Sequence, residues 1–168
     1  MQAHSFFLGG LPMLFYGDEA GYTNDYSYLE DEGKSYDNRW MHRPIIDWEK
    51  NKKITMPGTV EERVYSGTRK LLSIRKSIRV IADHSNLTWL TPHNIHVAGY
   101  MRAFGDNKFF GIFNFGSEES FLTWYAFKEQ SITKTRMYDH WKEREITIGN
   151  NDEYLVIAPY DFLLLEAM

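Results

Sequence analysis

The chain has 168 residues, 43% of them hydrophobic and 25% charged, with a formal net charge of −4. These values are ordinary for a soluble globular protein, and a chain of this length forms one domain or two small ones. The basic residues form no block, which argues against nucleic-acid binding. No apolar run approaches the roughly 20 residues of a membrane-spanning helix, so we expect no membrane partner.

Cysteine usage and the N-terminal residues bear on the compartment. The chain has no cysteine, which excludes disulfides and thiolate metal sites. The first residues lack the basic region and the small-residue cleavage site of a signal peptide. We therefore expect a cytoplasmic protein.

The first 58 residues are predicted to hold a helix end, a strand and a long loop. Residues 1–10 end a helix at Gly9-Gly10, because glycine commonly follows a helix C-terminus. Residues 11–16 are an uninterrupted apolar run, which is typical of a parallel strand buried on both faces. Residues 17–58 show little periodicity, and loops of this length in compact domains usually have a function.

A helix is predicted over residues 59–79. Thr59 with Glu62 three positions later matches a capping box at its start. One apolar stripe runs along it: Val60, Val64, Leu71, Ile74 and Ile78. With the strand at 11–16, this helix makes one βα unit.

From about residue 83 the pattern changes to short β-rich segments. We predict strands at 87–90, 95–104, 108–115, 120–127, 135–138, 145–148, 154–157 and 162–166. Turn signals separate some of them, at residues 105–107 and 149–151. Several short strands at this spacing predict an antiparallel β-sandwich.

The loop carries a motif that resembles a known family. Charged residues begin at Asp18, where the predicted strand ends, as in the catalytic loops of a (β/α)₈ barrel. Asn24-Asp25, followed by the sequence DNRWMHRP at residues 37–44, resembles the end of the catalytic barrel in the α-amylase family (glycoside hydrolase family 13). The similarity is greatest to amylosucrases and sucrose hydrolases.

The resemblance implies an α+β fragment with two parts. Residues 1–82 would be the last βα unit of a (β/α)₈ TIM barrel, and residues 83–168 an all-β antiparallel C-terminal sandwich. A closed barrel needs roughly 250 residues, so the chain cannot build one. We therefore expect the C-terminal part of a retaining α-glucosyl hydrolase or transferase that acts on sucrose or α-glucans.

Arg39 is the strongest candidate for a substrate-binding residue. Its guanidinium holds a carboxylate or sugar hydroxyls through a rigid fork of donors, which lysine cannot reproduce. The resemblance implies that Arg39 lies at the floor of the pocket for the glucosyl ring. The expected substrate-binding set is Arg39, Asp37, Tyr22 and Asp25. The expected supporting residues are Asp18, Glu19, Trp40, His42 and Arg43. The loop's aromatic residues either stack on a sugar or pack the loop, and the sequence leaves both readings open.

No catalytic residue is assigned. A glycosidase needs two carboxylates about 5–10 Å apart, whereas Asp18 and Glu19 are adjacent and would leave a strand in opposite directions. They are better suited to hold the loop by accepting hydrogen bonds. The family's catalytic carboxylates lie on earlier strands whose motifs do not occur here, so we expect the chain to be inactive alone. No cofactor and no metal site are expected.

Two other possibilities concern binding and assembly. The alternative function is a stand-alone carbohydrate-binding or assembly module that uses the sandwich. In either case the apolar strand and helix stripe would lack their barrel neighbours, and we expect self-association through that surface or disorder in residues 1–58.

Overall fold

The computed structural model describes residues 1–132, 136–147 and 154–168. They form two compact units, which consist of residues 1–12 with 71–168 and of residues 13–70. The resemblance implies a different boundary, after residue 82, between a barrel segment and a sandwich. That boundary stays a prediction.

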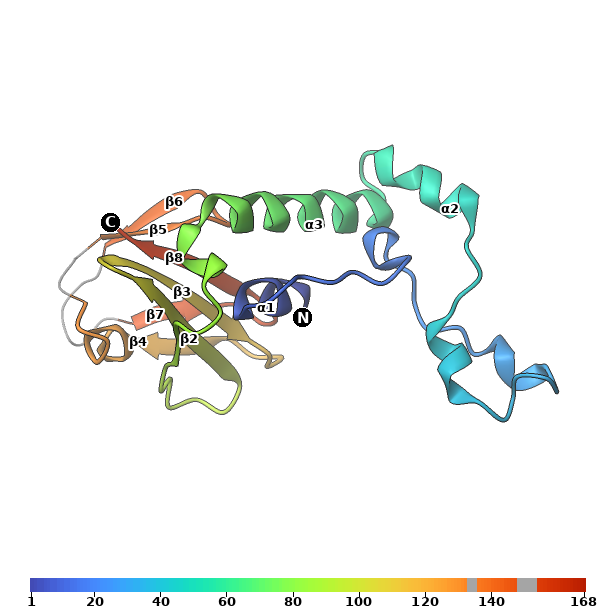
Figure 1. Ribbon diagram of the computed structural model, residues 1–168, viewed down its shortest axis with the longest axis horizontal. Helices are drawn as coiled ribbons and strands as arrows, with labels where there is room; N and C mark the ends of the chain where they lie inside the picture. The colour runs from blue at the N-terminus through green and yellow to red at the C-terminus, as the bar shows by residue number, and fades with distance from the viewer. Residues whose placement is uncertain (133–135, 148–153) are drawn as a thin grey trace. The chain divides into compact units, whose positions relative to one another are not determined.

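The larger unit is built on antiparallel sheets (Figure 1). Among the described residues, one sheet has six strands in the order β1-β2-β3-β8-β5-β6, and a second pairs β4 with β7. The strands are β1 (Leu87–Trp89), β2 (Val97–Phe104), β3 (Asn107–Asn114), β4 (Ser120–Thr123), β5 (Arg136–Asp139), β6 (Arg144–Thr147), β7 (Tyr154–Ile157) and β8 (Phe162–Ala167). The antiparallel strands predicted after residue 83 are confirmed, within a unit that is α+β because helices pack on it.

One predicted strand is too long. The strand expected at 120–127 ends at Thr123, and the chain turns into the short helix α4 (Tyr125–Lys128). Trp124, Ala126 and Phe127 are all buried, so the alternation of a strand breaks there. The turn expected at 149–151 lies outside the described residues.

An apolar core separates the two sheets. Phe110 and Leu165 of the large sheet belong to the same buried cluster as Leu122 of β4 and Ile157 of β7. Phe127 of α4 closes this cluster with its ring edge-on to Phe110, at a centroid distance of 5.0 Å. The predicted sandwich core therefore lies between the sheets.

Helices cover the other face of the large sheet. They are α1 (Gln2–Leu8), the C-terminal part of α3 (Val60–Ser77) and the 3₁₀ turn η5 (Arg79–Ala82). Phe7 of α1 stacks on Phe109 of β3 at 5.5 Å. Since both faces of β3 are covered, its sequence shows a continuous apolar run. Gly111 interrupts that run because a Cβ there would lie 2.7 Å from the Tyr100 ring.

Two arginines hold the C-terminal end of α1. Arg102 of β2 is fully buried, and its guanidinium donates to the carbonyls of Leu8 and Asp83. Its Nε donates to the side-chain oxygen of Asn86 at 2.6 Å. Arg75 of α3 donates to the carbonyls of Phe6 and Gly10. The last carbonyls of a helix have no partner within it, and these arginines supply one.

The predicted strand at 11–16 is wrong. No strand includes these residues, and Leu11 and Met13 are 91% and 85% exposed. A strand forms only when neighbouring strands pair its N–H and C=O groups. Among the described residues no strand pairs with this segment, so it forms no strand.

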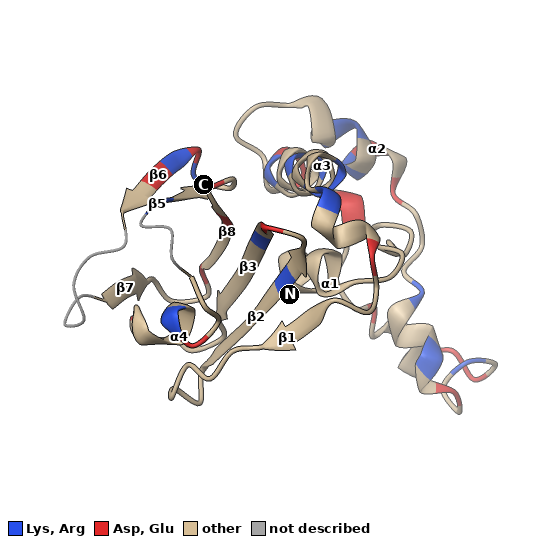
Figure 2. Ribbon diagram, turned by 60° about the vertical axis from the view of Figure 1, so that its left-hand side comes forward, with Lys and Arg blue, Asp and Glu red and all other residues tan. Residues whose placement is uncertain are grey.

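The predicted helix at 59–79 is confirmed as α3. The Thr59 hydroxyl accepts from the N–H of Glu62 at 3.1 Å, as a capping residue does. Lys and Arg occur along the helix (Figure 2), including Arg75 and Lys76 in its last turn, where the helix dipole favours cations. Among the described residues, no helix combines the length and apolar character needed to cross a bilayer.

The smaller unit consists of short helical turns joined by irregular segments. They are η1 (Asp18–Ala20), η2 (Ser27–Glu30), η3 (Asn38–His42), α2 (Trp48–Lys52) and η4 (Lys53–Thr55), followed by the start of α3.

Replacing Arg102 tests its role in holding α1. Arg102→Met keeps an apolar stem but orphans buried carbonyls, each worth about 1–3 kcal/mol when left unsatisfied. We expect the free energy of unfolding in urea to fall by at least about 2 kcal/mol. The matched control is Arg79→Met, an exposed position expected to change stability by no more than about 0.5 kcal/mol. Equal stability of the two variants would contradict the role.

Candidate functional site

The loop begins with a tight turn held by two carboxylates. Asp18 Oδ2 accepts from the N–H of Phe15 at 3.0 Å, and Glu19 Oε2 accepts from the N–H of Gly17 at 3.0 Å. Gly17 has φ 92°, and a Cβ there would lie 2.9 Å from the Tyr22 ring. Asp18 and Glu19 thus bind backbone donors of their own turn.

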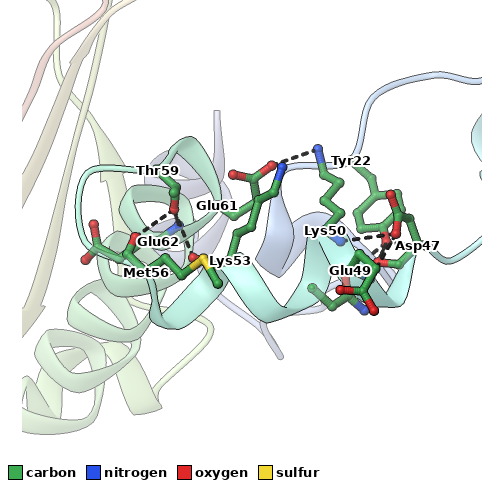
Figure 3. A network of polar contacts seen from close by, with 10 residues as sticks. Tyr22, Asp47, Glu49, Lys50, Lys53, Met56, Thr59, Glu61 and Glu62 are labelled. Carbon is green, nitrogen blue, oxygen red and sulfur yellow. Dashed lines mark hydrogen bonds and ion pairs between the residues drawn. The ribbon is translucent and has the colours of Figure 1, made fainter.

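The Tyr22 hydroxyl joins this turn to α2 (Figure 3). It accepts from the N–H of Asp47 at 2.7 Å. Its single proton is within reach of the Asp47 carbonyl at 2.8 Å and of Asn51 Oδ1 at 2.9 Å, and it can be donated to one of them at a time. The side chain of Asp47 caps α2 by accepting from the N–H groups of Glu49 and Lys50.

Contacts with α3 complete this network (Figure 3). Lys50 Nζ lies 3.4 Å from Glu61 Oε1 and 5.2 Å from the centre of the Tyr22 ring. The Thr59 hydroxyl also donates to the carbonyl of Lys53 or Met56, both at 2.9 Å. The two ends of the loop are therefore clasped within the smaller unit.

Arg39 lies in η3 and is paired with Asp37. Arg39 Nε is 2.9 and 3.0 Å from the two carboxylate oxygens, and its terminal nitrogen is 2.8 Å from Oδ2. Asp37 also caps η3 by accepting from the backbone N–H of Arg39 at 3.0 Å. Hydrogen bonds from the Arg39 side chain and backbone lower the pKa of Asp37. The Arg39 side chain remains 73% exposed, so the guanidinium is oriented yet accessible.

Asp25 and Trp40 lie beside η3. The N–H of Asp25 donates to the Met41 carbonyl at 2.8 Å, which ties the start of η2 to η3. The hydrogen bond from Ser27 lowers the pKa of the Asp25 carboxyl. The Trp40 ring lies within cation–π distance of Lys34 (5.4 Å) and Arg43 (5.3 Å).

The loop encloses two small hollows that divide the predicted residues. A hollow of about 260 Å³ is lined by Phe15, Tyr16, Asp18, Tyr22, Thr23, Asn24, His42 and Pro44. A second, of about 160 Å³, is lined by Asp25, Ser27, Tyr28, Asp31, Lys34, Trp40, Arg43 and Ile45. Both are smaller than the roughly 300–1,000 Å³ of sites for drug-sized ligands, so each can hold only a small ligand or one part of a larger ligand.

The predicted site residues are therefore not in one place. Tyr22, Asp18 and His42 share the larger hollow. Asp25, Trp40 and Arg43 share the smaller one. Arg39, Asp37 and Glu19 line neither hollow, although η3 also carries His42 and Trp40.

Sequence reasoning missed several residues of the larger hollow. The sequence predicts Phe15 inside a strand and marks Asn24 only as part of the family motif. Asn24 Oδ1 lies 3.2 Å from His42 Nδ1 and fixes that ring at the wall of the hollow. In the sequence, the only sign of this hollow was the pair of polar residues Asn24 and His42, which can hydrogen-bond to each other across the loop.

The polar side chains of the loop are better suited to binding a ligand than to catalysing a reaction. Asp18 and Glu19 are engaged by backbone N–H groups, and Asp37 is engaged by Arg39. Among the described residues, no group of three His, Cys, Asp or Glu side chains is placed to hold a metal ion. The exposed guanidinium of Arg39 and the aromatic side chains that line the two hollows can bind and orient a polar ring.

The fold is that of an α+β chain with antiparallel sheets, preceded by a long structured loop. No family model matches the chain. Solved structures do: AmyP in complex with maltotriose aligns over 99% of this chain and 33% of its own, with a TM-score of 0.71 and 12% identity. Cyclic α-maltosyl-(1→6)-maltose hydrolase from Arthrobacter globiformis aligns over 99% and 29%, with a TM-score of 0.61 and 19% identity.

A maltogenic amylase from S. marinus gives the same result, over 99% of this chain and 18% of its own, with a TM-score of 0.60 and 19% identity. These enzymes belong to the α-amylase family, and the chain matches the fold of their C-terminal region. The chain spans a third or less of the length of these three structures.

Removing the Tyr22 hydroxyl tests the clasp between the turn and α2. Tyr22→Phe leaves the N–H of Asp47 without its acceptor, so we expect amide exchange over residues 47–52 to accelerate about tenfold, the effect of losing one hydrogen bond. Tyr36→Phe is the matched control, because Tyr36 is 82% exposed and its loss should leave that exchange unchanged. Unchanged exchange in Tyr22→Phe would show that the hydroxyl does not hold α2.

Proposed function

We propose that the chain is the C-terminal part of a retaining α-glucosyl hydrolase or transferase of the amylosucrase type, which acts on sucrose or α-glucans. In such a reaction a carboxylate forms a covalent glucosyl intermediate, which water or a glucan hydroxyl then resolves. The observation that carries the proposal is the fold match, which covers 99% of the chain but a third or less of each enzyme. The motif around Arg39 narrows the proposal to sucrose-active members.

Arg39 would bind and position the glucosyl ring without taking part in bond making. Its pairing with Asp37 supports this role, because the carboxylate fixes the plane of the guanidinium and leaves its outer donors exposed. Tyr22 and Asp25 would contribute through the two hollows that they line.

The reactive carboxylates would come from the rest of the enzyme. Residues 1–82 would then belong to the end of its barrel, and residues 11–16 would pair with neighbouring barrel strands that the described residues do not include. This accounts for the exposed side chains of Leu11 and Met13. We expect cytoplasmic carbohydrate metabolism and no cofactor.

The test compares the 168-residue chain with the product of any longer reading frame that includes it. We expect no fructose release from sucrose by the chain alone, and sucrose turnover by the longer product. In that product Arg39→Ala should lower kcat/KM for sucrose about 10–100-fold, the value of charge-assisted hydrogen bonds. Arg63→Ala, an exposed position on α3, is the matched control and should retain full activity.

Two outcomes would count against the proposal. Fructose release by the 168-residue chain, abolished by a substitution within it, would show that the chain carries its own catalytic groups. A longer product with no activity on sucrose or α-glucans would favour a binding or assembly module instead.

Self-association follows from the apolar surface of the smaller unit. Several large apolar side chains are more than half exposed there: Met13, Phe15, Tyr26, Leu29, Tyr36, Ile45, Trp48 and Val60. We expect the purified chain to show a weight-average mass that rises with concentration in light scattering. The double variant Met13→Ser/Ile45→Ser should reduce that rise.

The matched control is Ile95→Ser, which removes an apolar side chain that is 96% exposed in the larger unit. It should leave the association unchanged. A concentration-independent monomer mass for the unmodified chain would contradict the expectation.

A further inference from the structure

The small sheet of β4 and β7 has an outer face of uniform character. Side chains alternate between its two faces, and the burial pattern follows this alternation in both strands. Leu122 and Ile157 belong to the sandwich core. The outward residues, here called the β4–β7 face, are Phe121, Thr123, Tyr154 and Val156.

Two aromatic rings form a corner on this face. The strands pair with Phe121 opposite Val156 and with Thr123 opposite Tyr154, so the two rings are diagonal neighbours. Their centroids are 4.9 Å apart, and their planes meet at 89°. Phe121 is 47% and Tyr154 is 53% exposed, so both rings present apolar surface to solvent.

Neither strand contains a charged residue, and the nearest described charge in the sequence is the exposed Glu119, which directly precedes β4. β4 has the sequence SFLT and β7 the sequence YLVI, and β7 shows neither blue nor red in Figure 2. A quarter of the chain's residues are charged, so two adjacent uncharged strands with outward aromatic rings stand out. A charged ligand would gain no ion pair from these strands, whereas a neutral one avoids the penalty of burying a charge.

The size of the face argues against a protein partner. Each strand has four residues, so the face is roughly 13 Å long, and the strands lie about 5 Å apart. A stable protein–protein interface buries about 800 Å² on each partner, several times what such a face offers. The length instead suits two or three units of a linear polymer of small rings.

We propose that the β4–β7 face binds a short stretch of a neutral α-glucan chain. A glucose unit has an apolar C–H face that packs on an aromatic ring and a hydroxyl edge that can reach the Thr123 and Tyr154 hydroxyls. The two rings at a right angle match successive units of a chain that bends from one unit to the next. The choice of an α-glucan rests on the proposed function, whereas the site itself rests on the sandwich alone.

The test is a titration of the purified 168-residue chain with maltoheptaose by isothermal calorimetry, with cellohexaose as the β-linked comparison. We expect millimolar or tighter binding of maltoheptaose and weaker binding of cellohexaose. Tyr154→Ala and Phe121→Ala should each weaken the binding about fivefold to tenfold, the scale of one aromatic contact. Phe104→Ala removes an aromatic ring that is 65% exposed at the end of β2, and it should have no effect.

Three results would overturn the inference. They are no heat of binding up to about ten millimolar maltoheptaose, equal affinity for cellohexaose, or full affinity in Tyr154→Ala. If the affinity is instead lost in Arg39→Ala, the glucan binds to the loop, which removes the β4–β7 site but supports the proposed function. Binding at the β4–β7 face with an inactive longer product would leave this inference standing and remove the proposed function.

Discussion

The architecture of the larger unit depends on two guanidinium groups at the end of α1, that of the buried Arg102 and that of the partly buried Arg75. The guanidinium groups of Arg102 and Arg75 donate to the carbonyls of Leu8 and Phe6 in this helix and of Gly10 just after it. Burial lowers the pKa of Arg102, and burial together with the charge of Arg102 lowers the pKa of Arg75. Two like charges are tolerated there because the carbonyls at a helix C-terminus carry partial negative charge. Gly9 is required beside them, since its φ is 142° and a Cβ would lie 2.8 Å from the Arg102 guanidinium. Without this junction, Phe7 would lose its stacking on Phe109 and the helical layer would lose its first element.

The loop of the smaller unit is held by a different kind of interaction. Its contacts are local hydrogen bonds, such as Tyr22 to Asp47 and Asp37 to Arg39, and few of its apolar side chains are buried. Networks of this kind fix the direction of polar groups, but they contribute little stability at exposed positions. A loop that is ordered yet poorly buried is suited to presenting recognition groups to a neighbour. This is the arrangement expected when the rest of a binding pocket comes from another part of a polypeptide.

The sequence correctly predicted elements whose signals lie within the segment itself. It failed for elements that depend on contacts with other segments. The helix α3 was predicted from its apolar stripe and Thr59 cap, and β7 was predicted with its bounds, because both signals are contained in the segment. The prediction of a strand at 11–16 was wrong because a strand forms only with pairing partners, and the segment's own sequence does not show whether such partners are present. Pairing of Arg39 with Asp37 could have been anticipated from their spacing and from the preference of Asp for a cap. The role of Arg102 could not, since a buried arginine in a strand is recognised only when the end of α1 is brought to it.

The two candidate sugar-binding surfaces share one electrostatic property. At the loop, Arg39 is neutralised by Asp37 before any ligand arrives, so the pair offers directed donors with no net charge. At the β4–β7 face, the strands are uncharged from the outset. A neutral sugar gains from directed hydrogen bonds and apolar contact but gains little from a net field, whereas a phosphate or an acidic peptide would favour an unpaired arginine. Under the proposed function, the pairing of Arg39 with Asp37 would therefore disfavour anionic ligands at the loop. Both surfaces would then favour neutral ligands, the loop through the ion pair of Arg39 with Asp37 and the β4–β7 face through the lack of charged residues in its two strands.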